Sequence, residues 1–63
     1  MTGAEFKQAR QSLGLTQEQL ARVMGYGSAP RLAELEARDV VKGPPARLME
    51  AYLAGYRPDD WPG

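Results

Sequence analysis

Apolar residues recur three and four positions apart in several short segments of the chain, which is the spacing of a helix face. In the first segment, expected to be a helix over residues 3–13, Phe6, Ala9 and Leu13 share one side with Arg10. No segment alternates apolar and polar residues as a half-buried strand would. The pattern predicts a compact all-α fold of four short helices, with a short C-terminal turn as an optional fifth, in a single domain over residues 1–63.

The expected hydrophobic core takes residues from all four helices. Its predicted members are Phe6, Leu13, Leu20, Met24, Leu32, Leu35, Leu48 and Tyr52. Tyr26 is expected to join this core from a turn, and Val40 and Val41 are expected to close its edge. A chain of 63 residues buries only about 60% of its unfolded surface, so its margin of stability is thin.

Cap signals define where the first two helices begin. The hydroxyls of Thr2 and Thr16 are each suited to accept a hydrogen bond from the backbone N–H three residues on, at Glu5 and Gln19. The side chains of Glu5 and Gln19 are in turn suited to accept from the backbone N–H of the threonine, which completes a capping box. Gly25 is expected to end the second helix, because glycine adopts the left-handed conformation needed there without steric cost.

A second cap and a short turn predict a helix-turn-helix over residues 16–38. The turn is expected at residues 25–27, and Ser28 is expected to cap the following helix. Pro30 suits the first turn of that helix, where a missing N–H costs nothing. The small side chain of Ala21 allows the two helices to approach closely, and the second helix is then presented outward.

The chain after residue 38 is expected to form a loop, a helix over about residues 45–54 and a tail over residues 55–63. Pro44 and Pro45 suit the first turn of this helix. Its expected inner stripe is Leu48, Ala51 and Tyr52, flanked by Met49 and Leu53. The tail contains too much proline to continue the helix.

The composition argues against an enzyme and against a metal or cofactor site. The chain has no cysteine and no histidine, which removes the disulfide, the thiolate and imidazole ligands and the commonest general base. Glu34 and Glu36 lie two positions apart on a helix, so they do not form a carboxylate pair. No small-molecule ligand is evident. Without an apolar run of membrane-spanning length or a signal peptide, a soluble, cytoplasmic protein with no membrane partner is expected.

The balance of charge bears on which partners are expected. The formal net charge is zero and the pI is about 6.1, which argues against a non-specific nucleic-acid coat but not against a specific reader. Four of the eight cations, Arg22, Arg31, Arg38 and Lys42, fall within the predicted helix-turn-helix or just after it.

The string R-x-x-L-G-L-T-Q-x-x-L-A from Arg10 to Ala21, with Gly25 and Leu35-Glu36, resembles the lambda-repressor/Cro-like helix-turn-helix family, also called the XRE family. The resemblance covers roughly residues 3–54. It implies an ion pair between Arg10 and Glu36, where the residues alone also allow Arg10 to snorkel to water. It further implies that Gln17 meets a DNA phosphate.

The chain departs from the family pattern by one extra residue between Gly25 and Leu32. The positions that usually read bases then fall on Ala29 and Pro30, whose side chains cannot hydrogen-bond a base edge. Direct readout is expected instead from three residues, Ser28, Arg31 and Glu34, or from a thymine methyl group against Ala29 or Pro30.

The resemblance implies a sequence-specific transcriptional regulator that binds double-stranded DNA, in the manner of a repressor. Arg31 is the first candidate for a forked contact to guanine; the alternatives are a solvated cation or a pair with Glu34. Glu34 is expected either to accept from cytosine N4 or to steer Arg31. Arg22, Arg38 and Lys42 are candidates for phosphate contacts.

A single module of this size buries little DNA surface, so a homodimer on a pseudo-palindromic operator is expected. Leu53, Tyr56 and Trp61 are the candidate dimer contacts, although Trp61 also suits a fold-back over its own helix. The competing interpretation is a protein-interaction module of the same fold, antitoxin-like or structural, that does not read DNA. Cations gathered on one face favour DNA, whereas scattered cations favour a protein partner.

Overall fold

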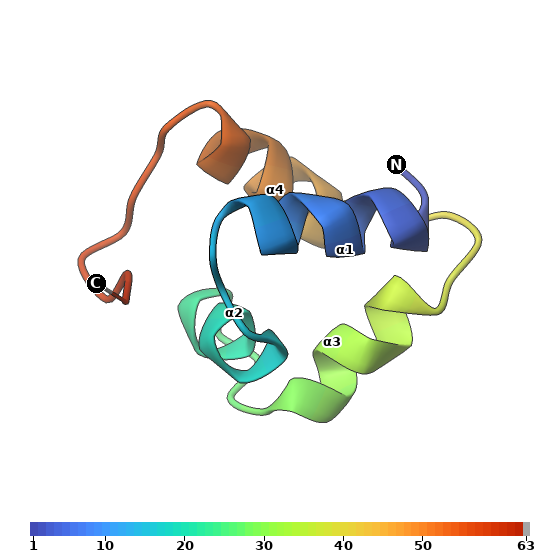
Figure 1. Cartoon of the computed structure of the whole chain (residues 1–63), viewed down its shortest axis with the longest axis horizontal. Coiled ribbons are helices and arrows are strands. Elements are labelled where there is room, and N and C mark those ends of the chain that lie inside the picture. The colour runs from blue at the N-terminus through green and yellow to red at the C-terminus, as the bar shows by residue number, and fades with distance from the viewer. Residues whose placement is uncertain (63) are drawn as a thin grey trace.

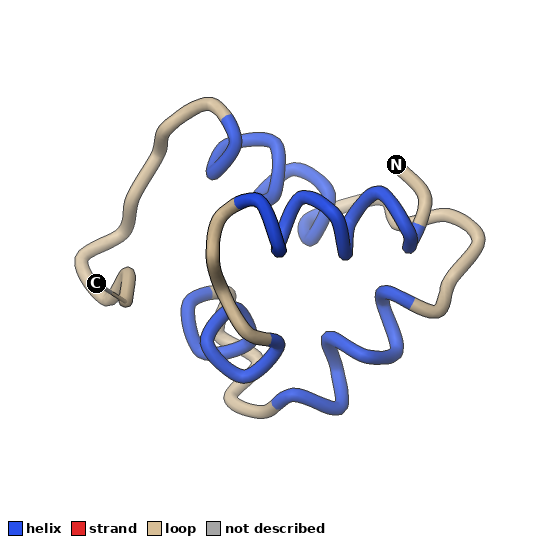
Figure 2. The backbone as a smooth tube through the Cα atoms, viewed as in Figure 1, coloured by secondary structure: helices blue, strands red, loops and turns tan. Residues whose placement is uncertain are grey.

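All four predicted helices are present in the computed structural model of the protein, which describes residues 1–62 (Figure 1). They are α1 (Gly3–Ser12), α2 (Gln17–Val23), α3 (Ala29–Glu36) and α4 (Pro44–Leu53). Residues 1–62 contain no strand and no fifth helix, and the optional C-terminal element is only a turn at residues 59–60 (Figure 2). The all-α fold is therefore confirmed. Gly63, the last residue of the expected domain and tail, lies outside the described residues.

The first two helices begin with the predicted capping boxes. The backbone N–H of Glu5 donates to Thr2 Oγ1 at 3.0 Å, and the N–H of Thr2 donates to Glu5 Oε1 at 2.7 Å. The corresponding distances between Thr16 and Gln19 are 3.1 and 2.9 Å. Each box satisfies two backbone groups that a helix start would otherwise leave without a partner.

The other two helices begin without a side-chain cap. Ser28 occupies the expected cap position of α3, with extended backbone angles, but its side chain makes no capping hydrogen bond. Pro30 at the second helical position has no N–H, so one of the donors that a cap would serve is absent. α4 begins at Pro44, one residue earlier than predicted, after Gly43 with φ of 75°.

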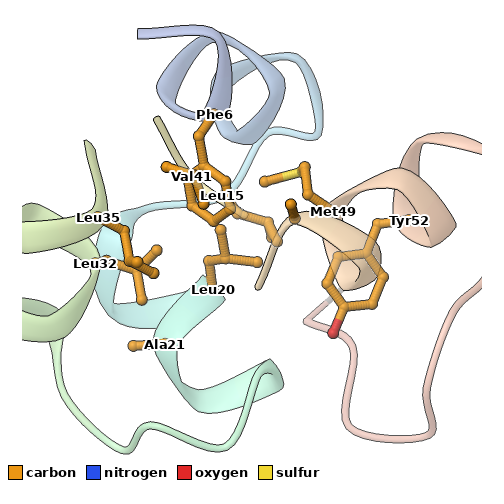
Figure 3. Close-up of a cluster of buried hydrophobic side chains, with 10 residues drawn as sticks. Phe6, Leu15, Leu20, Ala21, Leu32, Leu35, Val41, Met49 and Tyr52 are labelled. Atoms are coloured by element: carbon orange, nitrogen blue, oxygen red, sulfur yellow. The ribbon is translucent and has the colours of Figure 1, made fainter. Parts of the chain in front are cut away.

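The core lies between the four helices and takes side chains from all of them (Figure 3). α2 packs against α3, and α1 packs against both α3 and α4. The buried apolar residues are Phe6, Leu15, Leu20, Ala21, Leu32, Leu35, Val41, Ala46, Met49 and Tyr52. Predicted core members Leu13, Met24 and Leu48, together with Tyr26, are only partly buried and pack against this cluster.

The face that α4 turns inward differs from the predicted stripe. Met49 is fully buried, whereas Leu48 and Ala51 are only half-buried and Leu53 is exposed. Apolar residues occur on several sides of this helix, so helical spacing alone does not select the inner face. Packing against α1 makes the selection, and it places Met49 beside Tyr52 in the core (Figure 3).

The ends of α1 and α3 are joined through backbone contacts. The N–H of Gly3 donates to the carbonyl of Arg38 at 3.0 Å, and the N–H of Val41 donates to the carbonyl of Met1 at 2.7 Å. A Cβ atom on Gly3 would lie 2.4 Å from the carbonyl oxygens of both Glu36 and Arg38. Glycine therefore allows α1 to begin directly against the end of α3. Of the two valines expected at the core edge, Val41 is buried and Val40 is exposed.

The tail folds back onto α4 and places its tryptophan against the core. The rings of Trp61 and Tyr52 meet edge to face, with centroids 5.1 Å apart. The guanidinium of Arg57 lies 4.4 Å from the centroid of Trp61 and donates to the carbonyl of Tyr52 at 2.7 Å. This contact is a second hydrogen bond to a carbonyl at the end of α4, which also accepts from the N–H of Gly55 at 3.0 Å. Within the described residues no helix has both the length and the apolar character to span a membrane.

Candidate nucleic-acid interface

The face of α3 opposite the core is open to solvent. Leu32 and Leu35 are fully buried, and most of the residues between and around them point outward, with Glu36 as the exception. The exposed residues of this segment are Ser28, Pro30, Ala33, Glu34, Ala37 and Arg38; Ala29 and Arg31 are half-buried. The predicted base-reading positions therefore all retain some contact with solvent.

Three charged side chains on this face form one cluster, which we call the α3 charge cluster: Arg31, Glu34 and Arg38. Glu34 Oε1 accepts from Arg31 Nη1 and from Arg38 Nη2, each at 2.7 Å. The hydrogen bond from Arg38, together with the charge of Arg31, lowers the pKa of Glu34 below its ordinary value of 4.5. The pairing of Arg31 with Glu34, one of the alternatives open from the sequence, is thus present in the free chain.

Arg31 has a further contact that the sequence did not suggest. Its guanidinium carbon lies 5.4 Å from the centroid of the Tyr26 ring, within the range of a cation–π interaction. Tyr26 belongs to the connection between α2 and α3 and is half-buried against the core. Sequence reasoning placed Tyr26 only in the core, because the contact spans a turn and obeys no helical spacing.

Beneath this face, a buried ion pair joins α1 to α3. Arg10 Nε lies 2.7 Å from Glu36 Oε2, and Arg10 Nη1 donates to the carbonyl of Leu15 at 2.8 Å. The side chains of Arg10 and Glu36 are 10% and 6% exposed. The pair implied by the resemblance is therefore present, and Arg10 does not snorkel to water. Gln17 Nε2 donates to Glu36 Oε1 at 2.9 Å, which adds α2 to the same network.

Gln17 is also the predicted phosphate contact at the start of α2. Its side-chain amide uses one N–H for Glu36, and the same nitrogen carries a second N–H. The residue as a whole is half-buried, and the hydrogen bond to Glu36 holds its amide.

The four cations predicted near the helix-turn-helix do not form a single group. Arg31 and Arg38 meet at Glu34, whereas Arg22 pairs with Glu18 on α2 at 2.5 Å. Lys42 is exposed in the connection between α3 and α4, which lies at the right-hand edge of Figure 1, away from α2. Three of these four cations thus already have a carboxylate partner within the chain.

Of the predicted dimer contacts, Leu53 and Tyr56 are exposed, at 51% and 56%. Trp61 adopts the fold-back that the sequence also allowed: it is half-buried, and its ring packs on Tyr52 of the same chain. Tyr56 also stacks on Tyr52, with ring centroids 6.2 Å apart and planes 8° from parallel.

The described part of the chain, residues 1–62, contains no pocket and no group of three or more side chains suited to hold a metal ion. Within the same residues, every buried side-chain nitrogen or oxygen has a hydrogen-bond partner. No family model matches the chain, and searches of curated proteins and of solved structures also give no match.

Proposed function

We propose that this protein is a sequence-specific DNA-binding regulator with a lambda-repressor-like arrangement, in which α3 enters the major groove. The observation that carries the proposal is the exposed face of α3, which presents Arg31 beside small residues while Leu32 and Leu35 anchor the helix from below. An α-helix fits the major groove, and a guanidinium is able to bind guanine O6 and N7 through two parallel N–H groups.

In this proposal the small residues at the start of α3 allow the helix to approach the base edges closely. Ser28 offers a hydroxyl, and Ala29 and Pro30 offer apolar surface to a thymine methyl group. Arg31 follows as the principal base contact. Arg38 lies two turns further along the same face and suits a phosphate at the edge of the groove.

The buried network supports the proposal because it would hold α3 at a defined angle to the rest of the domain. Arg10, Gln17 and Glu36 come from three different helices and meet at one carboxylate. In this proposal Gln17 contacts a phosphate near the start of α2. The hydrogen bond from the same amide to Glu36 links that contact to α3. A rigid scaffold of this kind keeps base contacts in register.

We further propose that the chain acts as a homodimer on a pseudo-palindromic operator and represses by occluding a promoter. The exposed residues Leu53 and Tyr56 are the proposed dimer contacts. In such a dimer the two copies of α3 would lie about 34 Å apart, one turn of DNA.

The test is selection of bound sequences from a random DNA pool, first with the wild-type chain and then with Arg31→Ala. The wild type is expected to enrich one half-site, and Arg31→Ala is expected to lose preference at one position while retaining salt-sensitive binding. Arg47→Ala is the control, since Arg47 is an exposed arginine on α4 that also has a glutamate three residues on, Glu50 at 3.4 Å, although its side chain is 85% exposed against 40% for Arg31. A pool that shows no enrichment at low salt would overturn the proposal.

Salt dependence provides a second measurement of the same proposal. If each protomer neutralises about four phosphates, log affinity should fall with log salt with a slope of about −7 for a dimer. A slope near zero would contradict a DNA interface of this size.

One observation favours the alternative, a protein-interaction module that does not read DNA. All three arginines of residues 16–38 pair with glutamates of the chain: Arg22 pairs with Glu18 on α2, while Arg31 and Arg38 share Glu34, so the α3 charge cluster has a net charge of only +1. The pool selection separates the two functions, because a module for a protein partner has no reason to enrich a DNA sequence.

A further inference from the structure

We infer that Tyr26 and Glu34 hold the Arg31 guanidinium in one orientation and thereby determine how sharply α3 discriminates the base that Arg31 contacts. This inference rests on the proposed function. It assigns Tyr26, in the connection between α2 and α3, as a positioning residue for a base contact made by the next helix.

The ring of Tyr26 is itself well anchored. Its backbone N–H donates to the carbonyl of Ala21 at 2.8 Å, as part of the end of α2, and its side chain packs against the core. The guanidinium of Arg31, 5.4 Å from the ring centroid, therefore rests on a support fixed to the body of the domain. A surface arginine without such a support would sample many rotamers.

Glu34 constrains the same guanidinium from a second direction. Its carboxylate accepts from Arg31 Nη1, one turn away on the helix, and leaves the other N–H groups of the guanidinium unused by this bond. The ring and the carboxylate belong to different elements, so together they restrict both the position and the rotation of the group. Enough donors remain for a two-bond contact to guanine O6 and N7.

The carboxylate has a second consequence for specificity. A guanidinium already paired with Glu34 gains less from an arbitrary phosphate, because the phosphate must compete with a carboxylate at 2.7 Å. Sequence-independent binding through Arg31 is thereby weakened relative to the correct base contact. Discrimination is a difference of two affinities, so weakening the wrong complex raises it.

Arg38 is the natural comparison within the same cluster. It shares Glu34 and has a similar side-chain exposure, 45% against 40% for Arg31. Within residues 1–62, however, its guanidinium has no aromatic ring beneath it. We therefore expect Arg38 to contact phosphate without base preference.

The experiment compares wild type, Tyr26→Leu, Tyr26→Phe and Glu34→Gln on two duplexes. The first duplex carries the site selected by the wild type. The second differs from it at one base pair, the position at which Arg31→Ala loses its sequence preference. A good forked contact discriminates its base by about 5- to 150-fold. Tyr26→Leu is expected to lose most of that ratio, and Tyr26→Phe, which keeps the ring, is expected to retain it.

The other variants supply the controls. Glu34→Gln is expected to lower the same ratio mainly by strengthening binding to the altered duplex. Arg38→Ala is expected to weaken binding to both duplexes equally. If Tyr26→Leu does not fold, Glu34→Gln decides the inference, since Glu34 is exposed and its loss does not disturb the core.

A readout in the free protein separates positioning from simple packing. The NMR order parameter of the Arg31 Nε–H group is expected to fall in Tyr26→Leu and to remain high in Tyr26→Phe. Unchanged discrimination and unchanged order in Tyr26→Leu would overturn the inference while leaving the DNA-binding proposal intact. Failure of the wild type to select any sequence would overturn the proposed function, and this inference with it.

Discussion

At the scale of single residues, Glu36 stands out because its charged side chain is buried and depends on partners from two other helices. Its carboxylate is nearly removed from water and accepts from Arg10 and from Gln17. A buried charge without its partner costs far more than the complete pair contributes, so the pair makes each of its members hard to replace. The same group determines how α3 is held, which links folding to the proposed DNA contact.

We predict that Glu36→Gln lowers the free energy of unfolding by about 3–5 kcal/mol, because it leaves the Arg10 guanidinium buried and unpaired. A domain of this length has about 3–9 kcal/mol in total, so much of the variant should be unfolded at 25 °C. Urea denaturation followed by circular dichroism measures the change. Glu50→Gln, which breaks an exposed pair on α4, should change stability by less than about 1 kcal/mol. Equal losses in the two variants would contradict the assignment.

Tyr52 leads to a prediction about alkaline pH. Burial, with smaller contributions from the charges of Tyr56, Asp60 and Tyr26, raises the pKa of the Tyr52 hydroxyl above its ordinary value of 10.0. The folded state therefore holds this proton more tightly than the unfolded state does. The resulting stability is complete below pH 10 and is lost as pH rises through the folded pKa.

We expect tyrosinate absorbance to show that Tyr52 ionises above the value of a free tyrosine, with the chain losing stability over the same range. Tyr52→Phe removes the titrating group and should flatten this part of the curve of stability against pH. A wild-type curve that coincides with that of Tyr52→Phe above pH 10 would show that the hydroxyl has no such role.

At the scale of elements, the helices differ in how their ends are satisfied. α2 is only seven residues long and depends on both the Thr16 box and the Gly25 stop. α3 begins directly after Ser28, whose side chain makes no capping bond, and is held mainly by its buried leucines and by Glu36. An isolated helix of either length would be unstable in water, so tertiary packing provides most of their stability.

We predict that Thr16→Ala destabilises the domain by about 1 kcal/mol, since it removes the acceptor for the Gln19 N–H. Ser28→Ala should cost much less, because the Ser28 side chain makes no capping bond. Urea midpoints of the two variants provide a direct comparison. A larger loss for Ser28→Ala than for Thr16→Ala would mean that α3 is capped in solution by its serine.

At the scale of the whole molecule, the tail completes a core that the four helices leave open beside α4. Figure 1 shows the tail leaving the end of α4 and returning alongside the domain. Its residue Trp61 contacts Tyr52 of α4. The Arg57 side chain joins the tail to the end of α4. Trp61 and Arg57 thus join the tail to α4, while Leu53 and Tyr56, the proposed dimer contacts, are exposed.

We predict that two variants at this end of the molecule change different properties, one the stability of the fold and the other the proposed association. Trp61→Ala should reduce stability by about 1–3 kcal/mol, roughly half the cost of removing a fully buried tryptophan. Leu53→Ser should leave monomer stability nearly unchanged and weaken the proposed dimer. Thermal unfolding and sedimentation measure the two properties separately. If Trp61→Ala abolished association without loss of monomer stability, the tail would belong to the interface instead.

The local features of this fold were accessible from the sequence. Helical spacing, the two threonine boxes and the Gly25 stop act within about four residues, so they predict the four helices and several of their ends. Phe6, Leu20, Leu32 and Leu35 were assigned to the core correctly, because each lies on the one apolar side of its helix. The ion pair of Arg10 with Glu36 followed only from a family resemblance.

Contacts between elements depended on the tertiary structure. Three features were not predictable in this way: which face of α4 turns inward, the packing of Trp61 on Tyr52, and the contact of Arg31 with Tyr26. Each depends on contacts between residues that are not spaced three or four apart on one helix. The pair of Arg31 with Glu34 was one of the alternatives open from the sequence, whereas the pairs of Arg22 with Glu18 and of Arg38 with Glu34 were not predicted. Spacing determines which residues share a side of one helix, whereas only packing decides what that side meets.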